Sequence, residues 1–267
     1  MRTSPLMRMP SRLYAGILVA FIALLATVLI LSIPGSSGQR MAVPAFFPPG
    51  RLWSQIDSAA PTLQLVVMNP ASGPGSAYNQ SYGTVVRTAQ RRGITVLGYV
   101  DTNYGARGLS AVESDVDHYY SWYHVNGVFF DRASTDCALA MAPMSYYATL
   151  NAYVKAKGGA ARTILNPGKQ TNECFLADAD ILLTFEGSDM QYINSYSAPS
   201  WVANYSPSHF WHVIYGAASG SAMTHAVRLS KQRGAGFVYV TPDTLPSPYD
   251  TLPTGRYWTT ELGDLRG

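Results

Sequence analysis

Short apolar segments alternate with helical segments along residues 42–241, and this alternation restricts the possible folds more than any other feature. The apolar segments are rich in β-branched and aromatic residues and predict eight strands, at 42–47, 63–69, 94–101, 127–131, 161–166, 180–186, 212–216 and 236–241. Helices are predicted between them at 52–60, 79–92, 110–124, 144–157, 173–177 and 222–234. This order predicts an α/β fold, a (β/α)8 TIM-type barrel, with a doubly wound open sheet as the alternative.

The first 40 residues differ from the rest of the chain. Residues 14–33 carry no charge, and three arginines, Arg2, Arg8 and Arg12, precede them. Twenty apolar residues in a helix span about 30 Å, the thickness of a bilayer core, and the arginines favour a cytoplasmic amino terminus. We therefore expect residues 1–40 to be a basic flank, a membrane-spanning segment and a linker, and residues 41–267 to form an extracellular domain.

Two other interpretations of this segment stay open. The small residues of SIPGSSGQR would also suit cleavage of a long signal peptide, after which the domain would be secreted. A buried helix of a soluble domain is the third interpretation, and it fits the basic flank and the polar linker less well.

The net charge of +3 comes from the amino-terminal segment. Residues 1–40 contain four arginines and no acid, which leaves 15 basic and 16 acidic residues in 41–267. The predicted domain therefore lacks the basic excess typical of nucleic-acid binding, and we expect no nucleic-acid partner. We expect it to be a monomer.

The two cysteines, Cys137 and Cys174, are expected to form a disulfide in an exported domain, with two free buried thiols as the alternative. Two cysteines without a matching histidine cluster make a poor zinc site, and the five histidines show no metal-binding spacing. We therefore predict no metal site and no cofactor.

Two of the predicted strands end in an acid. GVFFDRAS (127–134) ends in Asp131, with Arg132 beside it, and ADILLTFEGS (179–188) leads to Glu186. In a (β/α)8 barrel the active site lies at the carboxyl ends of the strands, so these two acids should meet at one mouth. Burial among aromatic residues would raise the pKa of Asp131, and the adjacent arginine would lower it.

Two carboxylates in a polar, aromatic-rich cleft suggest cleavage of a glycosidic bond. Other polar strand ends and aromatic side chains are candidates for substrate binding. These candidates are Asp101, Tyr104, Arg132, Asn166, Trp201, Asn204 and Tyr215. We expect at least half of the aromatic candidates to serve packing alone.

Five motifs resemble the spherulin-4-like family, which corresponds to glycoside hydrolase family 135. They are VPAFFPPG at 43–50, GYVDTNYG at 98–105, GVFFDRAS at 127–134, ILNPG at 164–168 and ADILLTFEGS at 179–188, and the resemblance covers roughly residues 42–262. It implies a (β/α)8 fold and endo-acting hydrolysis of α-1,4-linked galactosamine or N-acetylgalactosamine polymers in an extracellular matrix.

The resemblance also assigns roles. Asp131 would be the nucleophile and Glu186 the acid/base, or the reverse. We predict a retaining outcome for this pair of acids. The family pattern has Glu where this chain has Arg132. If Arg132 paired with Asp131, a surface module that binds glycan without cleaving it would be the alternative. A polysaccharide deacetylase is a weaker one, because no His/Asp metal cluster stands out in the sequence.

Overall fold

The computed structural model describes residues 38–140 and 144–266. The predicted membrane segment, 14–33, lies outside these residues. Within them, no helix combines the length and hydropathy needed to cross a bilayer.

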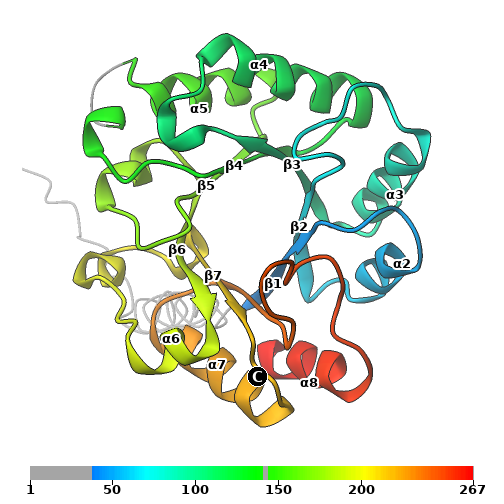
Figure 1. Ribbon diagram of the computed structural model, residues 1–267, viewed down its shortest axis with the longest axis vertical. Coiled ribbons are helices and arrows are strands. Elements are labelled where there is room, and N and C mark those ends of the chain that lie inside the picture. Colours follow the sequence, from blue (N-terminus) through cyan, green and yellow to red (C-terminus); the bar gives the residue numbers. More distant parts are fainter. Residues whose placement is uncertain (1–37, 141–143, 267) are drawn as a thin grey trace, which may run out of the picture. The chain divides into compact units, whose positions relative to one another are not determined.

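Eight parallel strands form a closed barrel in which each strand pairs with its neighbours in sequence and β8 pairs with β1 (Figure 1). The strands are β1 (Arg40–Ala45), β2 (Leu63–Met68), β3 (Thr95–Asp101), β4 (Gly127–Asp131), β5 (Arg162–Asn166), β6 (Ile181–Ser188), β7 (Phe210–Tyr215) and β8 (Phe237–Val240). This closure confirms the predicted barrel and rules out the open sheet.

Helices surround the barrel on its outside (Figure 1). The α-helices are α2 (Arg51–Ser58), α3 (Gln80–Arg91), α4 (Leu109–His118), α5 (Tyr146–Lys157), α6 (Asp189–Asn194), α7 (Gly220–Gln232) and α8 (Gly255–Arg266). A π-helical turn, η2 (Tyr119–Tyr123), extends α4. Short 3-10 turns occupy several loops: η1 (Asn103–Gly105), η3 (Cys137–Leu139), η4 (Glu173–Ala177), η5 (Ser200–Asn204) and η6 (Pro207–His209).

The strands and the larger helices match the predicted segments to within two or three residues at most ends. Two helices were not predicted from the sequence, α6 and α8. The first is short and begins directly where β6 ends, with a capping box between Ser188 and Gln191. The second follows the long loop after β8 and packs against α7 and β1.

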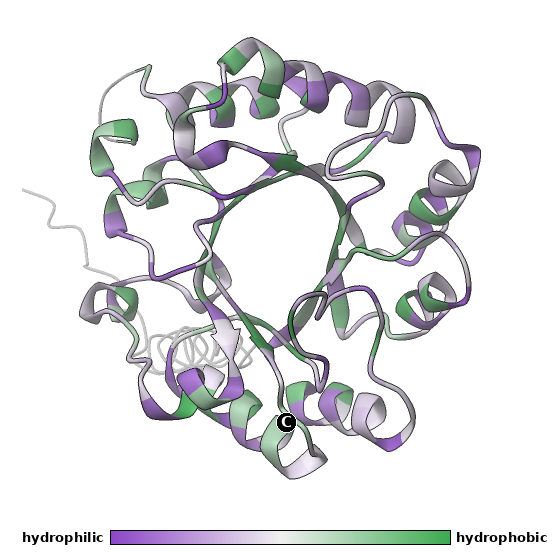
Figure 2. Cartoon of the chain, in the orientation of Figure 1, coloured by the Kyte–Doolittle hydropathy of each residue, from purple (hydrophilic) through white to green (hydrophobic). Residues whose placement is uncertain are grey.

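The core fills both the barrel and the layer between the barrel and its helices. The strands are apolar along most of their length, whereas the helices alternate apolar and polar residues (Figure 2). Inside the barrel, the rings of Phe129 and Trp211 meet edge to face at a centroid distance of 5.8 Å. Trp211 is fully buried, so the barrel is closed by side chains beneath its mouth.

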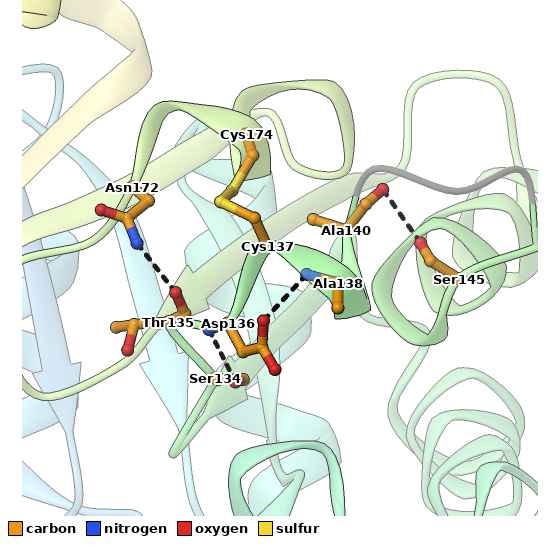
Figure 3. Close-up of a disulfide and its surroundings, with 9 residues drawn as sticks. All are labelled: Ser134, Thr135, Asp136, Cys137, Ala138, Ala140, Ser145, Asn172 and Cys174. Carbon is orange, nitrogen blue, oxygen red and sulfur yellow. Dashed lines mark hydrogen bonds between the residues drawn. A yellow bond between two sulfur atoms is a disulfide. The ribbon is translucent and has the colours of Figure 1, made fainter.

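The predicted disulfide is confirmed. Cys137 and Cys174 are bonded, with their Cα atoms 5.8 Å apart (Figure 3). The bond joins the loop after β4 to the loop after β5, both at the carboxyl ends of the strands. Asn172 adds a second link between these loops by donating a hydrogen bond to the carbonyl of Thr135, at 2.8 Å.

Candidate active site

A pocket of about 290 Å³ lies at the carboxyl ends of the strands. Its walls combine two acids with aromatic and small residues. The lining residues are Pro44, Phe46, Tyr104, Phe129, Asp131, Arg132, Asn166, Pro167, Gly168, Leu183, Glu186, Val213, Tyr215, Leu245 and Tyr249. This is the mouth at which the sequence predicts the strand-end acids to meet.

Three polar residues occupy one row across adjacent strands. Asp101 of β3 is the register partner of Asp131, and Asp131 is the partner of Asn166 on β5. Residues paired in register on parallel strands point to the same face of the sheet. Phe129, two residues before Asp131, also lines the pocket, as the period of two requires.

Glu186 reaches the pocket through an irregularity in β6. Leu183 and Glu186 both line the pocket, although a regular strand points residues three apart to opposite faces. The register between β6 and β7 shifts between Leu183 and Phe185. Because of this shift, Glu186 points to the same face of the strand as Leu183. Phe185 therefore packs outside the barrel against Tyr192, and Glu186 turns inward.

Asn166 joins the two acids. Its amide Nδ2 donates to Asp131 Oδ1 at 2.8 Å and to Glu186 Oε2 at 2.6 Å. These two carboxylate oxygens therefore lie no farther apart than the sum of the two distances. The backbone N–H of Gly168 donates to Asn166 Oδ1 at 2.9 Å and fixes which end of the amide faces the acids.

Two tyrosines donate to the remaining carboxylate oxygens. Tyr99 Oη donates to Asp131 Oδ2 at 2.7 Å, and Tyr249 Oη donates to Glu186 Oε1 at 2.8 Å. Burial raises the pKa of both acids above its ordinary value, while these hydrogen bonds act in the lowering direction. The same loss of hydration raises the pKa of both phenols.

The two acids differ in the neighbouring charge that raises the pKa of each. The pKa of Glu186 is raised by burial and further by the negative charge of Asp131, whereas Asp101 is the charge that adds to the raised pKa of Asp131. Both pKa values are thus raised, and the two carboxyl groups lie close enough for the charge of one to oppose ionisation of the other. One ionised and one protonated carboxyl group is the arrangement that acid and nucleophile roles require.

Arg132 does not pair with Asp131. Its guanidinium donates to both carboxylate oxygens of Asp101, at 2.8 and 2.6 Å, and lies 5.6 Å from the ring centre of Tyr104. A left-handed backbone conformation at Arg132, with φ of 46°, turns its side chain toward Asp101. Arg132 does act to lower the pKa of Asp131, but through its backbone N–H and not through its guanidinium, and burial outweighs this effect. The ion pair with Asp131 on which the non-catalytic alternative depended is not formed, because the guanidinium pairs with Asp101.

A model of the spherulation-specific family 4 matches residues 40–264. The chain belongs to this family. Spherulin-4 of Physarum polycephalum is 35% identical over 167 residues, which are 61% of this chain. They are 48% of that protein, so the match spans about half the length of the relative.

Solved structures share the fold of this family member. The crystal structure of Aspergillus clavatus Sph3 in complex with GalNAc superposes with a TM-score of 0.71 at 22% identity, covering 87% of this chain and 99% of that one. A chitinase from Chromobacterium violaceum superposes with a TM-score of 0.53 at 11% identity, covering 85% and 99%. The barrel thus shares its fold with both of these structures.

The structure brings most of the sequence-predicted residues of this family member together. Tyr104, Arg132, Asn166 and Tyr215 line the pocket beside the two acids. Asp101 lies outside the lining, and its carboxylate is held by Arg132 and by the backbone N–H of Asn103.

Two residues that were predicted to bind substrate lie away from the pocket. Trp201 and Asn204 belong to η5, in the segment that leads into β7 at the amino-terminal side of the barrel. Trp201 packs on Phe210, the first residue of β7, and Asn204 is exposed. Segments that precede a strand lie at the opposite end from the pocket, so neither residue can reach it.

Nine of the fifteen residues that line the pocket were not predicted as site residues from the sequence, among them Phe46, Leu245 and Tyr249. Phe46 follows β1, and Leu245 and Tyr249 belong to the loop between β8 and α8. The available signal for the last two was that LPSPYD (245–250) lies in the loop after the last strand, because loops of this kind surround the mouth of a barrel.

Within residues 38–140 and 144–266, no cluster of three or more His, Cys, Asp or Glu side chains has the spacing to hold a metal ion.

Proposed function

We propose that this chain is an extracellular, endo-acting glycoside hydrolase that cleaves α-1,4-linked galactosamine and N-acetylgalactosamine polysaccharide. One observation carries the proposal: a single amide, Asn166, holds Asp131 and Glu186 side by side in a pocket at the barrel mouth. Two carboxyl groups at this distance can protonate a glycosidic oxygen and attack the anomeric carbon without a cofactor.

The close approach of the two acids favours retention of configuration. Retaining enzymes hold their carboxyl groups about 5–5.5 Å apart, and inverting enzymes about 6.5–9.5 Å apart to admit a water molecule. The shared hydrogen-bond donor limits the nearest oxygens of Asp131 and Glu186 to the shorter range. In this proposal Asp131 serves as the nucleophile, and Glu186 serves as the acid and then the base.

The substrate class rests on the family and on the sugar in its structural relative. Sph3 of Aspergillus clavatus has been crystallised with GalNAc, and its fold matches most of this chain. The pocket here is large enough for a sugar ring, and Tyr104 and Tyr215 offer flat surfaces in its wall.

Digestion of the polymer tests the activity. The purified chain is incubated with α-1,4-linked galactosamine/N-acetylgalactosamine polymer, and new reducing ends are counted. Asp131→Asn and Glu186→Gln should each lower the rate by at least about 10²-fold, while Glu113→Gln on the outer helix α4 should leave it unchanged. Binding of the polymer without product in the unmodified chain would instead support a glycan-binding module.

Rescue by azide distinguishes the nucleophile from the acid/base. With an aryl α-glycoside, Asp131→Ala should regain turnover in azide and yield the β-glycosyl azide, since azide then attacks in place of the missing carboxylate. Glu186→Ala should yield the α-glycosyl azide, because azide attacks the β-linked glycosyl-enzyme. The reverse assignment of products would exchange the roles of the two acids, and NMR of the anomeric proton reads the outcome.

Export is part of the proposal and rests on residues 1–40 of the sequence. Mass spectrometry of the mature amino terminus, from cells that make the chain, decides between a membrane anchor and a cleaved signal peptide. An intact terminus in the membrane fraction indicates an anchor, and a new terminus near residues 34–40 in the medium indicates a cleaved signal. An intact chain in the soluble cytoplasmic fraction would contradict both.

A further inference from the structure

A second cavity, of about 300 Å³, adjoins the first on the side of the loop between β8 and α8. The two cavities share a wall made of Phe46, Glu186, Tyr215, Leu245 and Tyr249. The far side of the second cavity is formed by Pro246, Ser247, Pro248 and Asp250. A chain molecule that fills the first cavity can therefore continue into the second without leaving the mouth of the barrel.

The catalytic groups are divided unequally between the two cavities. Glu186 lines both, whereas Asp131 and Asn166 line only the first. In glycoside cleavage the nucleophile lies beneath the ring that is attacked, and the acid lies beside the oxygen that links this ring to the leaving group. Glu186 stands at the boundary where that linking oxygen must lie.

The second cavity carries a negative charge of its own. Asp250 is exposed at its edge, and its carboxylate has no hydrogen bond or ion pair with any residue in the described part of the chain. The first cavity has Arg132 in its wall instead. The guanidinium of Arg132 is paired with Asp101, so Asp250 is the acid that the second cavity adds for contact with a cationic galactosamine unit of the polymer.

We propose that the second cavity is the subsite for the leaving-group sugar and that Asp250 selects an unacetylated, cationic amino sugar there. This inference rests on the proposed function, because it takes Asp131 and Glu186 as the catalytic pair. It fixes the direction of the polymer across the mouth. The non-reducing side lies over the first cavity toward Tyr104 and Arg132, and the reducing side lies over residues 245–250.

The composition of the products tests the subsite. The polymer is partly and randomly N-acetylated, then digested to low extent with the purified full-length chain at low ionic strength. The sugar that occupied the leaving-group subsite becomes the new non-reducing end of each released fragment. Mass spectrometry should find unacetylated galactosamine enriched at that end by about two- to fivefold over its average in the polymer, the range for one exposed ion pair.

Variants assign the enrichment to Asp250. Asp250→Asn should abolish it, and Asp250→Lys should turn it into depletion, while both still cleave the fully N-acetylated polymer. Glu113→Gln, the same loss of a carboxylate on the outer face of α4, should keep the full enrichment. Raising the salt concentration should weaken the enrichment in the unmodified chain, because exposed charges are screened.

The outcomes separate this inference from the function on which it rests. A chain that releases no fragments refutes the proposed function and the inference with it. Fragments without enrichment, or with equal enrichment in Asp250→Asn, refute the role of Asp250 alone. Enrichment of the cationic sugar at the new reducing end would place it in the first cavity and overturn the proposed direction.

Discussion

Asn166 is the residue on which the geometry of the site depends. Its side-chain amide donates one hydrogen bond to each of the two acids, and the backbone N–H of Gly168 donates to the oxygen of that amide. A buried polar group with all its partners present is rigid, and its partners are rigid with it. The two carboxyl groups are therefore oriented before any substrate arrives.

Tyr249 and Tyr99 should each affect a different limb of the pH profile of kcat/KM. Tyr249 lowers the pKa of Glu186, so Tyr249→Phe should raise that pKa. An acid catalyst works below its pKa, and the alkaline limb of kcat/KM should move to higher pH by about half to one unit, the effect of one hydrogen bond. A pH profile measured on an oligosaccharide checks this shift.

Tyr99→Phe is the matched change on the other acid. Tyr99 lowers the pKa of Asp131, so its loss should raise that pKa. A nucleophile works above its pKa, and the acidic limb should move to higher pH while the alkaline limb stays in place. If Tyr249→Phe moved the acidic limb instead, Glu186 would be the nucleophile and the assignment would be reversed.

Among the structural elements, the loops after β4 and β5 are joined by the disulfide of Cys137 and Cys174 (Figure 3). The first loop carries Arg132 and the second carries Pro167 and Gly168, all of which line the pocket. The bond thus ties together two walls of the site that belong to neighbouring strands.

Removing the disulfide should weaken both the fold and the site. Its sequence separation of 37 residues corresponds to about 4 kcal/mol in the chain-entropy estimate. The double variant C137S/C174S should therefore unfold on the order of 10 °C earlier in a thermal scan. Its kcat should fall as well, because Gly168 would no longer fix Asn166. A dithiothreitol-treated chain should behave in the same way, and unchanged kcat in both would show that the loops hold the site without the bond.

For the whole molecule, the closure of the barrel involves a buried acid. Glu261 of α8 is fully buried, and the backbone N–H of Val240 in β8 donates to its Oε1 at 2.8 Å. Its Oε2 has no hydrogen-bond partner among the described residues. Burial raises the pKa of Glu261 from 4.5 to about 8.

This raised pKa should make the stability of the barrel depend on pH. The folded state favours the protonated form, so the free energy of unfolding falls by about 1.4 kcal/mol per pH unit as pH rises from 4.5 to 8. Glu261→Gln keeps the acceptor for Val240 and removes the charge. It should raise the Tm at pH 8 and leave it nearly unchanged at pH 4, as differential scanning calorimetry can measure. An equal effect at both pH values would mean that Glu261 does not titrate in this range.

Much of the fold was predictable because its signals are local. Strand and helix segments follow from the periodicity of apolar residues within each segment, and eight alternations leave few alternatives to a closed barrel. α6 and α8 were missed because the first is short and the second follows a long loop. The acids Asp131 and Glu186 were found because they follow apolar runs, a pattern visible in the sequence alone.

The sequence by itself determined the order of elements, the barrel and the end of it at which the acids gather. The tertiary structure alone decided which of these groups touch. The register shift in β6 turns Glu186 inward, the left-handed conformation at Arg132 directs it to Asp101, and Tyr249 arrives from a loop 63 residues away from its partner. Such contacts depend on packing between segments far apart in the chain, and no local pattern of residues encodes this packing.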